Sequence, residues 1–329
     1  MTRIVVIGLG PLGQRLVRYA LERRSVRVVG AVDIDPAKIG KDIGLLCGMR
    51  RLGITTKGNL ASALAGHPAD VALVTTVSNL AALEPQVVEA ARLGLDVVST
   101  CEELSFPWVA APRLAKRLDA VCRRHGVSCI GTGVNPGFLM DYLPSILTAV
   151  NQKVRRVTVE RVQDASARRL PFQKKIGAGL TRLEFRKRAA EGTLRHVGLQ
   201  ESAHMIAHAL GWRLSKTTES LRPVIASRRI LSGYCPIEPG MACGVEQICR
   251  GYLNNRLAIL LRFRAAVGEP RSYDRVEIRG EPDFVSLIEG GINGDVATCA
   301  IVLNAVRSVR AARPGLVTML DIPAVTFKD

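Results

Sequence analysis

Three glycines near the start of the chain have the spacing of a loop that binds a dinucleotide. The run Gly8-Leu9-Gly10-Pro11-Leu12-Gly13 lies between an aliphatic stretch at 3–7 and a stretch of helical periodicity at 14–24. A second aliphatic stretch at 26–32 ends at Asp33, 20 residues beyond the last glycine. The glycine motif alone is a weak signal, but strand, loop, helix, strand and terminal acid in this order predict a dinucleotide site.

Each residue of this loop has a physical task in such a site. Gly8 would permit the tight turn, Gly10 would let the backbone reach the pyrophosphate, and Gly13 would let helix and strand pack closely. The helix N-terminus would offer N–H groups to the phosphates. Pro11 fits the first helical turn, where its missing N–H is no loss. We expect the whole loop to contact the cofactor.

Asp33 is placed to accept hydrogen bonds from an adenosine ribose, which favours NAD. A 2′-phosphate would be repelled by this carboxylate unless a cation offset it. Lys38 and Lys41 follow closely, so NADP use stays open. An alternative is that Asp33 caps a helix starting near Pro36.

Two further predicted strands have carboxyl ends that should lie near the ligand, because ligands of open α/β sheets bind beyond these ends. They are the buried run at 70–75 and the run at 96–99. We expect the residues at and just after their ends to lie by the cofactor: Thr75, Thr76, Val77 and Thr100.

Two carboxylates follow the strand at 96–99 and are candidate acid/base groups. They are Glu102 and Glu103. One of them has a structural alternative, capping the helix that opens near Pro107. We expect one glutamate but not both to be structural, and prefer Glu102 as the catalytic group.

The segment 131–144 (GTGVNPGFLMDYLP) lies between two different sequence patterns. Short aliphatic runs alternate with helical patterns before it, and longer, basic, alternating segments follow it. Its glycines and its Asn-Pro-Gly turn allow sharp bends and close approach to a ligand. We expect it to connect two domains and to form the floor of an active site, with a plain linker as the alternative. Asn135 and Pro136 would bind the nicotinamide carboxamide.

The bulk properties narrow the class of protein. The chain has 329 residues, 47% of them hydrophobic and 23% charged, which is typical of a globular protein with room for two domains. No apolar run reaches the length of a membrane span, and no signal peptide is evident, so we expect a cytoplasmic protein. The net charge of +17 comes from scattered arginines, and aromatics are only 4%, which argues against a nucleic-acid partner.

Metal binding is not expected. The eight cysteines form no CxxC pair, and no histidine lies between Cys235, Cys243 and Cys249. The five histidines form no HExxH motif.

The second half predicts an α+β domain. Its expected elements are strands at 154–164, 212–220, 256–267 and 274–278, helices at 182–190 and 199–210, and a cationic, glycine-containing loop at 165–181 that could cover a pocket. A helix at 294–312 would return to the first domain. The predicted fold is therefore α/β: a Rossmann-type, doubly wound parallel sheet (1–136, completed by 295–329) plus an α+β substrate-binding and dimerisation domain with an open mixed sheet (137–294).

Long stretches of the chain resemble the family of 2,4-diaminopentanoate dehydrogenases and amine dehydrogenases, within the dihydrodipicolinate-reductase-like superfamily. The resemblance covers nearly the whole chain. It is carried by STCEELSFPW (99–108), GTGVNPGFLMD (131–141), RVQDASARRLPFQKKIGAGL (161–180), HVGLQES (196–202), GDVATCAIVLNAV (294–306) and ARPGLVTMLDIP (312–323).

The resemblance implies nicotinamide-dependent oxidative deamination of a small amine or diamino acid, reversible as reductive amination of a ketone by ammonia. It implies a catalytic carboxylate at Glu102 or Glu103, and homodimers formed through the open sheet. The dihydrodipicolinate reductases carry a histidine-pair and lysine motif that this sequence lacks.

A substrate pocket can be outlined within the resembling stretches. Four residues would form an apolar wall: Phe138, Met140, Phe172 and Leu180. Four more are possible polar contacts, with a surface or structural role equally open for each: Gln163, Arg168, Gln173 and His196.

Two rival functions stay open at this point. One is an NAD(P)H-dependent reductase of another C=N or C=O bond. The other is a non-catalytic NAD-binding regulator, although no DNA- or partner-binding module is found.

Overall fold

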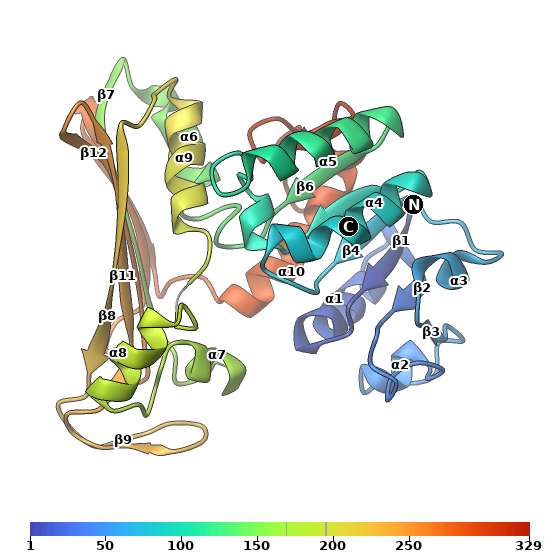
Figure 1. Cartoon of the computed structure of the whole chain (residues 1–329), viewed down its shortest axis with the longest axis horizontal. Coiled ribbons are helices and arrows are strands. Elements are labelled where there is room, and N and C mark those ends of the chain that lie inside the picture. Colours follow the sequence, from blue (N-terminus) through green and yellow to red (C-terminus); the bar gives the residue numbers. More distant parts are fainter. Residues whose placement is uncertain (169, 195) are drawn as a thin grey trace. The chain divides into compact units, whose positions relative to one another are not determined.

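The chain folds into two compact units. The computed structural model describes every residue except 169 and 195. Unit 1 comprises Met1–Phe138 and Asn293–Asp329, and unit 2 comprises Leu139–Ile292 (Figure 1). Unit 1 is thus built from both ends of the sequence.

Unit 1 contains a seven-stranded sheet in which every pairing is parallel. Its strands alternate with helices along the chain, as expected for a doubly wound fold. In spatial order they are β15 (Gly315–Val317), β6 (Ser128–Gly131), β5 (Asp96–Ser99), β4 (Val71–Val74), β1 (Thr2–Ile7), β2 (Val26–Val32) and β3 (Thr56–Lys57).

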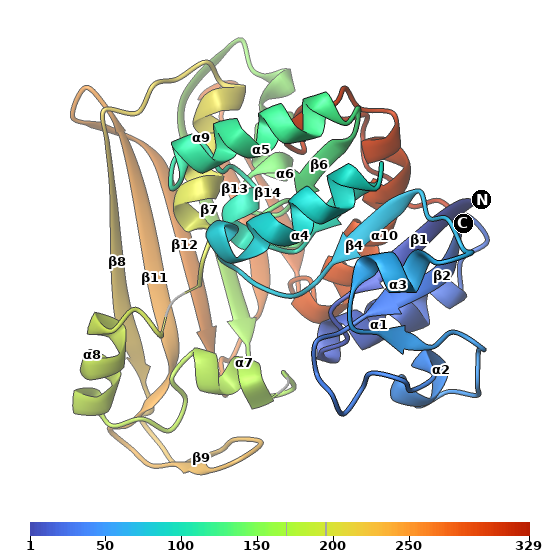
Figure 2. The ribbon, with the colours of Figure 1, turned by 45° about the vertical axis from the view of Figure 1, so that its right-hand side comes forward.

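Helices cover both faces of this sheet. One face carries α1 (Pro11–Leu21) and α10 (Gly294–Arg310), which pack against each other. The opposite face carries α3 (Leu60–Leu64), α4 (Leu80–Arg92) and α5 (Pro112–Arg124); α4 and α5 lie side by side in Figure 2. Short elements at the strand ends are α2 (Ile43–Leu46) and the 3-10 turn η1 (Glu102–Leu104).

Unit 2 is a six-stranded mixed sheet with helices on one face. Its strands in spatial order are β14 (Phe284–Glu289), β13 (Tyr273–Glu281), β7 (Lys153–Asp164), β12 (Arg256–Ala266), β11 (Ala242–Leu253) and β8 (Lys216–Ile225). Only the β7–β12 pairing is parallel among the described residues. The helices are α6 (Tyr142–Leu147), α7 (Leu170–Lys175), α8 (Arg182–Ala190) and α9 (Leu199–Ala209), with η2 (Thr148–Val150) and a hairpin of β9 (Ile230–Leu231) and β10 (Pro236–Ile237).

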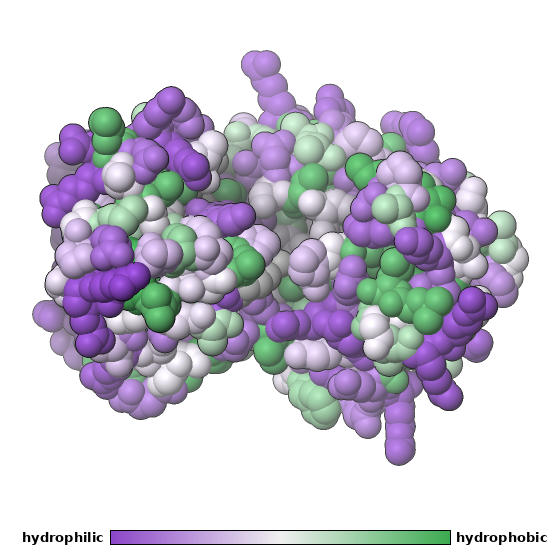
Figure 3. Space-filling view, turned by 90° about the horizontal axis from the view of Figure 1, so that it is seen from below, coloured by the Kyte–Doolittle hydropathy of each residue, from purple (hydrophilic) through white to green (hydrophobic). Residues whose placement is uncertain are grey.

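The chain has many charged residues, and the helices of its described part are not suited to a bilayer. None of the helices in the described part of the chain combines the length and the apolar character needed to cross a membrane. On the face shown in Figure 3, strongly hydrophilic residues are spread over the surface rather than gathered in one area.

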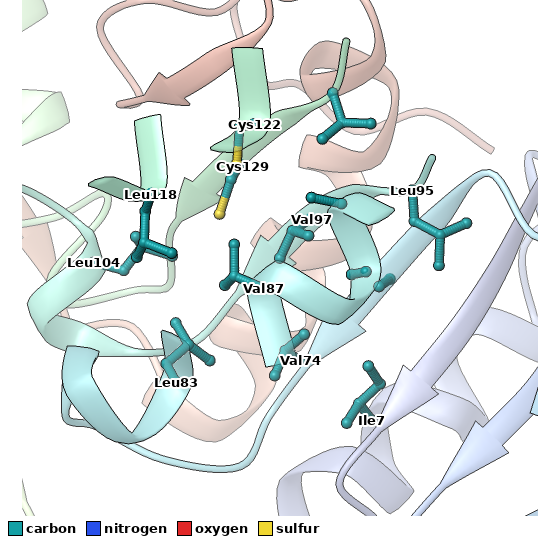
Figure 4. Packing of buried hydrophobic residues seen from close by; sticks show 14 of the residues in the cluster. Ile7, Val74, Leu83, Val87, Leu95, Val97, Leu104, Leu118, Cys122 and Cys129 are labelled. Carbon is teal, nitrogen blue, oxygen red and sulfur yellow. The ribbon is translucent and has the colours of Figure 1, made fainter. Parts of the chain in front are cut away.

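The core of unit 1 explains why short aliphatic strands suffice. Alternate residues of the parallel strands point toward α4 and α5, and a set of residues from these elements packs tightly between sheet and helices (Figure 4). Val74 and Val97 of the sheet meet Leu83, Val87 and Leu118 of the helices in this cluster. Because each such side chain leaves water on folding, its burial contributes roughly 1.5–3 kcal/mol.

The predicted fold class is confirmed, while several elements differ from expectation. The third strand lies at Thr56–Lys57 rather than at 53–55, and β8 begins at Lys216 rather than at Trp212. Several elements were not expected from the sequence: the strands β9, β10, β11, β14 and β15, and the helices α2, α3, α6 and α7. Here α7 occupies part of the predicted loop at 165–181.

Candidate nucleotide and active site

The glycine loop is as tightly packed as a phosphate-binding turn requires. Gly8 has φ +93°, a conformation that side chains disfavour. A Cβ atom on Gly13 would lie 1.9 Å from the carbonyl oxygen of Gly8, while one on Gly10 would meet nothing within 4 Å. Thus Gly8 and Gly13 bring α1 against the turn, and Gly10 leaves an open approach to the backbone.

The N-terminus of α1 is suited to an anion. Gly10 is its N-cap residue, no described side chain caps the first turn, and Pro11 stands at the first helical position. No acidic residue lies in this turn. The free N–H groups and the helix dipole therefore favour a phosphate here.

The two threonines at the end of β4 differ in what they hold. The Thr75 hydroxyl donates to the Gly8 carbonyl oxygen at 2.8 Å, so it fixes the glycine loop. The Thr76 hydroxyl donates to Gln86 at 2.9 Å and is exposed. Val77 packs against the unit 1 core, and the Thr100 N–H continues the sheet by donating to Val74.

Asp33 is held at the end of β2 by three donors. Its carboxylate accepts hydrogen bonds from the Leu9 N–H at 2.7 Å, the Asp35 N–H at 2.9 Å and the Lys38 Nζ at 3.0 Å. Burial alone would raise its pKa, but these three donors outweigh burial, and the pKa of Asp33 is lowered. The segment after Pro36 forms a turn, so Asp33 does not cap a helix there.

The two glutamates of η1 have different surroundings. The Glu103 carboxylate accepts from the Leu80 N–H at 2.8 Å and from the Asn79 side chain at 3.1 Å, which caps the N-terminus of α4. The helix capped is therefore α4 and not, as the alternative supposed, the one opening near Pro107. Glu102 is half-buried, and its carbonyl oxygen accepts from the Ser105 hydroxyl at 2.7 Å.

Asn135, which follows β6, has a buried side-chain amide whose polar atoms make no hydrogen bond within the described chain. Its side chain is only 9% exposed, yet neither its Oδ1 nor its Nδ2 has a partner among the described residues. The nearby Thr132 hydroxyl is buried and likewise unpaired within the described chain. Buried amides are almost always hydrogen-bonded, so these atoms fit a ligand with both donors and acceptors, such as a carboxamide. The Asn135–Pro136 peptide is cis.

Two of the polar residues proposed for the substrate contact each other, Gln163 of β7 and Arg168 of the loop that follows it. Gln163 donates to the Ile292 carbonyl oxygen at 2.8 Å and accepts from Arg168 at 3.0 Å. The Arg168 guanidinium also lies over the ring of Phe172, 4.1 Å from its centroid. The structure thus brings three of the predicted residues together: Gln163, Arg168 and Phe172.

Gln173 serves the protein's own backbone. It is 1% exposed, and its Nε2 donates to the carbonyl oxygens of Ala165, Ser166 and Arg168 while its Oε1 accepts from the Gly233 N–H. Through these hydrogen bonds Gln173 holds the segment around α7 against Gly233.

His196 is neutral in this environment. Its ring packs against Phe263 with centroids 4.4 Å apart, and its Nδ1 is buried without a partner among the described residues. Burial, together with the charges of Lys175 and Arg161, lowers the pKa of His196 to about 3. Gln247 holds the backbone of His196 through both its N–H and its carbonyl group.

The apolar candidates divide by burial. Met140 is fully buried and belongs to the core of unit 2, whereas Phe172 and Leu180 of unit 2 are half-buried. Phe138 is half-buried and is the last residue of the first segment of unit 1. Met140 therefore packs in the core, while the other three candidates keep part of their surface exposed to solvent.

A buried ion pair that was not predicted from the sequence lies beside Gln163. Arg161, 2% exposed, donates to Asp274 at 2.6 Å and to the Ile292 carbonyl oxygen at 2.8 Å. Burial lowers the pKa of Arg161, and Asp274 counteracts this effect. Alternation along β7 places Arg161 and Gln163 on one face of the sheet. The burial of Arg161 was not predicted because the sequence has many arginines and nothing distinguishes this one.

Among the described residues, no group of three or more His, Cys, Asp or Glu side chains could hold an ion.

Comparison with known proteins agrees with the fold and the glycine loop, which define a dinucleotide-binding protein of the Rossmann type. The family model described as "2,4-diaminopentanoate dehydrogenase C-terminal domain" matches residues 138–327. The model described as "dihydrodipicolinate reductase, N-terminus" matches residues 2–99. The chain belongs to the 2,4-diaminopentanoate dehydrogenase family.

Individual relatives span nearly the full chain. It is 31% identical to the 2,4-diaminopentanoate dehydrogenase of Acetoanaerobium sticklandii, covering 98% of this chain and 93% of that protein. It is 23% identical to an amine dehydrogenase of Streptomyces virginiae, covering 98% and 96%. The solved structure of an amine dehydrogenase from Mycobacterium smegmatis has the same fold, with TM-score 0.88 at 24% identity over 99% and 97% of the chains. These findings confirm the predicted resemblance and the prediction that the chain is a dehydrogenase.

Proposed function

We propose that this protein is an NAD(P)-dependent amine dehydrogenase that deaminates a small amine or diamino acid and, in reverse, aminates a ketone with ammonia. One observation carries the proposal: an acid and an unpaired amide stand at the same sheet edge as the glycine loop. Gly8, Glu102 and Asn135 follow β1, β5 and β6, whose parallel carboxyl ends share that edge. Ligands of open α/β sheets bind there.

The residues of unit 1 divide the work of binding the cofactor. The α1 N-terminus and the glycine loop would hold the pyrophosphate, and Asp33 the adenosine ribose. Asn135 would hold the carboxamide, which satisfies both of its unpaired atoms. When bound, the nicotinamide supplies hydride acceptance and donation.

Glu102 is the proposed acid/base group. In deamination its carboxylate takes a proton from the substrate ammonium, and the carbon bearing that nitrogen loses a hydride. Hydride loss leaves a substrate iminium, which water converts to ketone and ammonium, and the protonated Glu102 releases its proton to solvent. The net reaction is protonated amine, oxidised cofactor and water giving ketone, ammonium, reduced cofactor and a proton.

Unit 2 is proposed to supply the substrate contacts. The proposed apolar contacts are Phe138, which belongs to unit 1, and Met140, Phe172 and Leu180, which belong to unit 2. The proposed polar contacts are Gln163, Arg168, Gln173 and His196. The need for nicotinamide nucleotides suits a cytoplasmic reaction.

The decisive test is whether oxidation of NADH depends on ammonium. The purified protein would be incubated with NADH and a panel of ketones and keto acids, with and without ammonium. The proposal expects NADH consumption only when both ketone and ammonium are present, with the amine detected as product. Consumption without ammonium would favour a reductase of another C=O or C=N bond, and binding without turnover a regulator.

We further propose that the protein is a homodimer formed through the outer face of the unit 2 sheet. In Figure 1 no helix of the described chain lies over this face. It carries ion pairs that run across four strands, from Glu246 through Arg262 and Glu160 to Arg275. Exposed apolar residues such as Leu287, 44% exposed, lie on the same face.

A charge on this face should separate the copies. We expect Leu287→Glu to shift the mass measured by light scattering from two chains toward one. Leu183→Glu on α8, which is 74% exposed, should leave the mass unchanged. A monomeric wild-type protein would refute the proposal.

A further inference from the structure

Asp33, the residue proposed to hold the adenosine ribose, is paired with a cation of its own loop. The Lys38 Nζ lies 3.0 Å from Asp33 Oδ2 and 3.6 Å from Asp35 Oδ2. Asp33 is 8% exposed, whereas the Lys38 side chain is 24% exposed. The cation therefore lies on the solvent side of the buried carboxylate.

This ion pair changes how an acid at the end of β2 discriminates between NAD and NADP. An unpaired carboxylate there would accept the ribose hydroxyls of NAD and repel the 2′-phosphate of NADP. Lys38 compensates this charge, and its ammonium is a flexible donor that can exchange one anion for another.

Asp33 would not be left unsatisfied if Lys38 moved. Its carboxylate would still accept the Leu9 N–H at 2.7 Å and the Asp35 N–H at 2.9 Å. These two bonds come from backbone groups fixed by the glycine loop and by the turn after Asp33. The lysine is thus the one mobile partner among the three donors.

Resting on the function proposed above, we propose that Lys38 is the specificity-determining residue that admits NADP beside NAD. With NAD, Lys38 stays on Asp33 and the ribose hydroxyls donate to the carboxylate. With NADP, Lys38 turns from Asp33 to the 2′-phosphate and screens it from both carboxylates. NAD remains the better ligand because Asp33 and Asp35 together carry one more charge than Lys38 balances.

The test measures nucleotide binding without any substrate. Isothermal titration of adenosine 2′,5′-bisphosphate and of 5′-AMP would be compared for the wild type, Lys38→Met, Lys38→Arg and Lys116→Met. Lys116 is exposed on α5, so its variant has the same change in net charge at a remote place. Circular dichroism confirms that each variant is folded.

We expect Lys38→Met to weaken bisphosphate binding about tenfold or more, as the loss of a direct charge contact requires, and to change AMP binding less than threefold. Lys38→Arg should keep most of the bisphosphate affinity, and Lys116→Met all of it. The bisphosphate affinity of the wild type should also fall more steeply with salt than that of Lys38→Met. The ratio of kcat/KM for NADP to that for NAD should follow the same order.

Two results would overturn the proposal. Equal losses for both nucleotides would show that Lys38 only supports Asp33, and unchanged bisphosphate binding would show that it does not meet the phosphate. Because binding is measured without amine or ketone, a protein that binds nucleotides as expected but turns over no amine would refute the proposed reaction and not the role of Lys38.

Discussion

Glu102 and Glu103 are adjacent acids with opposite proposed roles, and exchanging each in turn separates catalysis from stability. Glu102→Gln keeps the size of the side chain but cannot accept a proton. General acid/base groups contribute about 10²–10⁴-fold, so we expect kcat to fall at least about 100-fold, or about 2.7 kcal/mol in activation free energy. The melting temperature should change little.

Glu103→Ala should give the reverse pattern. It removes the acceptor of the Leu80 N–H at 2.8 Å and leaves Asn79 as the side-chain cap of α4 among the described residues. Loss of a cap costs about 1 kcal/mol, which for a chain of this size lowers the melting temperature by about 2–4 °C. The kcat should stay within about threefold of the wild type.

The assay is the steady-state rate of NADH formation from the amine that the ketone screen identifies, with thermal unfolding followed by circular dichroism. Near-normal turnover by Glu102→Gln with loss of turnover in Glu103→Ala would refute the assignment. It would show that the acid capping α4 in this structure leaves the helix to take part in the reaction.

Three further changes test the packing and charges around the two candidate regions. Gly13→Ala places a Cβ 1.9 Å from the Gly8 carbonyl oxygen, so calorimetry should show at least about tenfold weaker NAD binding, and unchanged binding would contradict the tight loop. Asp274→Asn leaves the Arg161 charge buried without its partner and should cost about 3–5 kcal/mol in urea unfolding; a loss below about 1 kcal/mol would show that the pair is solvated. The pKa of His196 is about 3 when folded and near 6.5 when unfolded, so protonation favours the unfolded chain as pH falls below about 6.5. His196→Gln should therefore lose about 2 kcal/mol less stability than the wild type between pH 7 and pH 5. An equal loss in the two proteins, measured by urea unfolding at both pH values, would refute a neutral His196.

Local signals made unit 1 predictable from sequence. The glycine loop and Asp33 belong to one strand–helix–strand unit, and each residue's task follows from backbone geometry within about 25 residues. The helix α8 was likewise predicted with its observed bounds from a helical sequence pattern, and in the structure a capping box of Thr181 and Glu184 begins it.

Contacts between residues far apart in the sequence could not be predicted from local sequence patterns. Glu103 caps α4 through Leu80, 23 residues earlier, and Gln163 meets Ile292 across 129 residues. The strand β11 was missed because its run ACGVEQICRGYL mixes glycine, cysteine and charges and lacks a clear alternation of apolar and polar residues. Only three residues make up β15, and its pairing with β6 rather than its composition defines it.

The position of β15 and α10 in unit 1 has a consequence for synthesis. The parallel sheet that holds the glycine loop is closed on one edge by β15 and covered by α10, which packs on β4, β5 and β6. Both elements leave the ribosome after all of unit 2, which is one uninterrupted stretch of chain. In most multidomain proteins the N-terminal domain folds first during synthesis. In this chain unit 2 can fold before unit 1 is complete, because unit 1 needs α10 and β15 in addition to its first 138 residues. During that interval the apolar side of β4 to β6 is uncovered, so the nascent nucleotide-binding unit is the part that needs protection from aggregation.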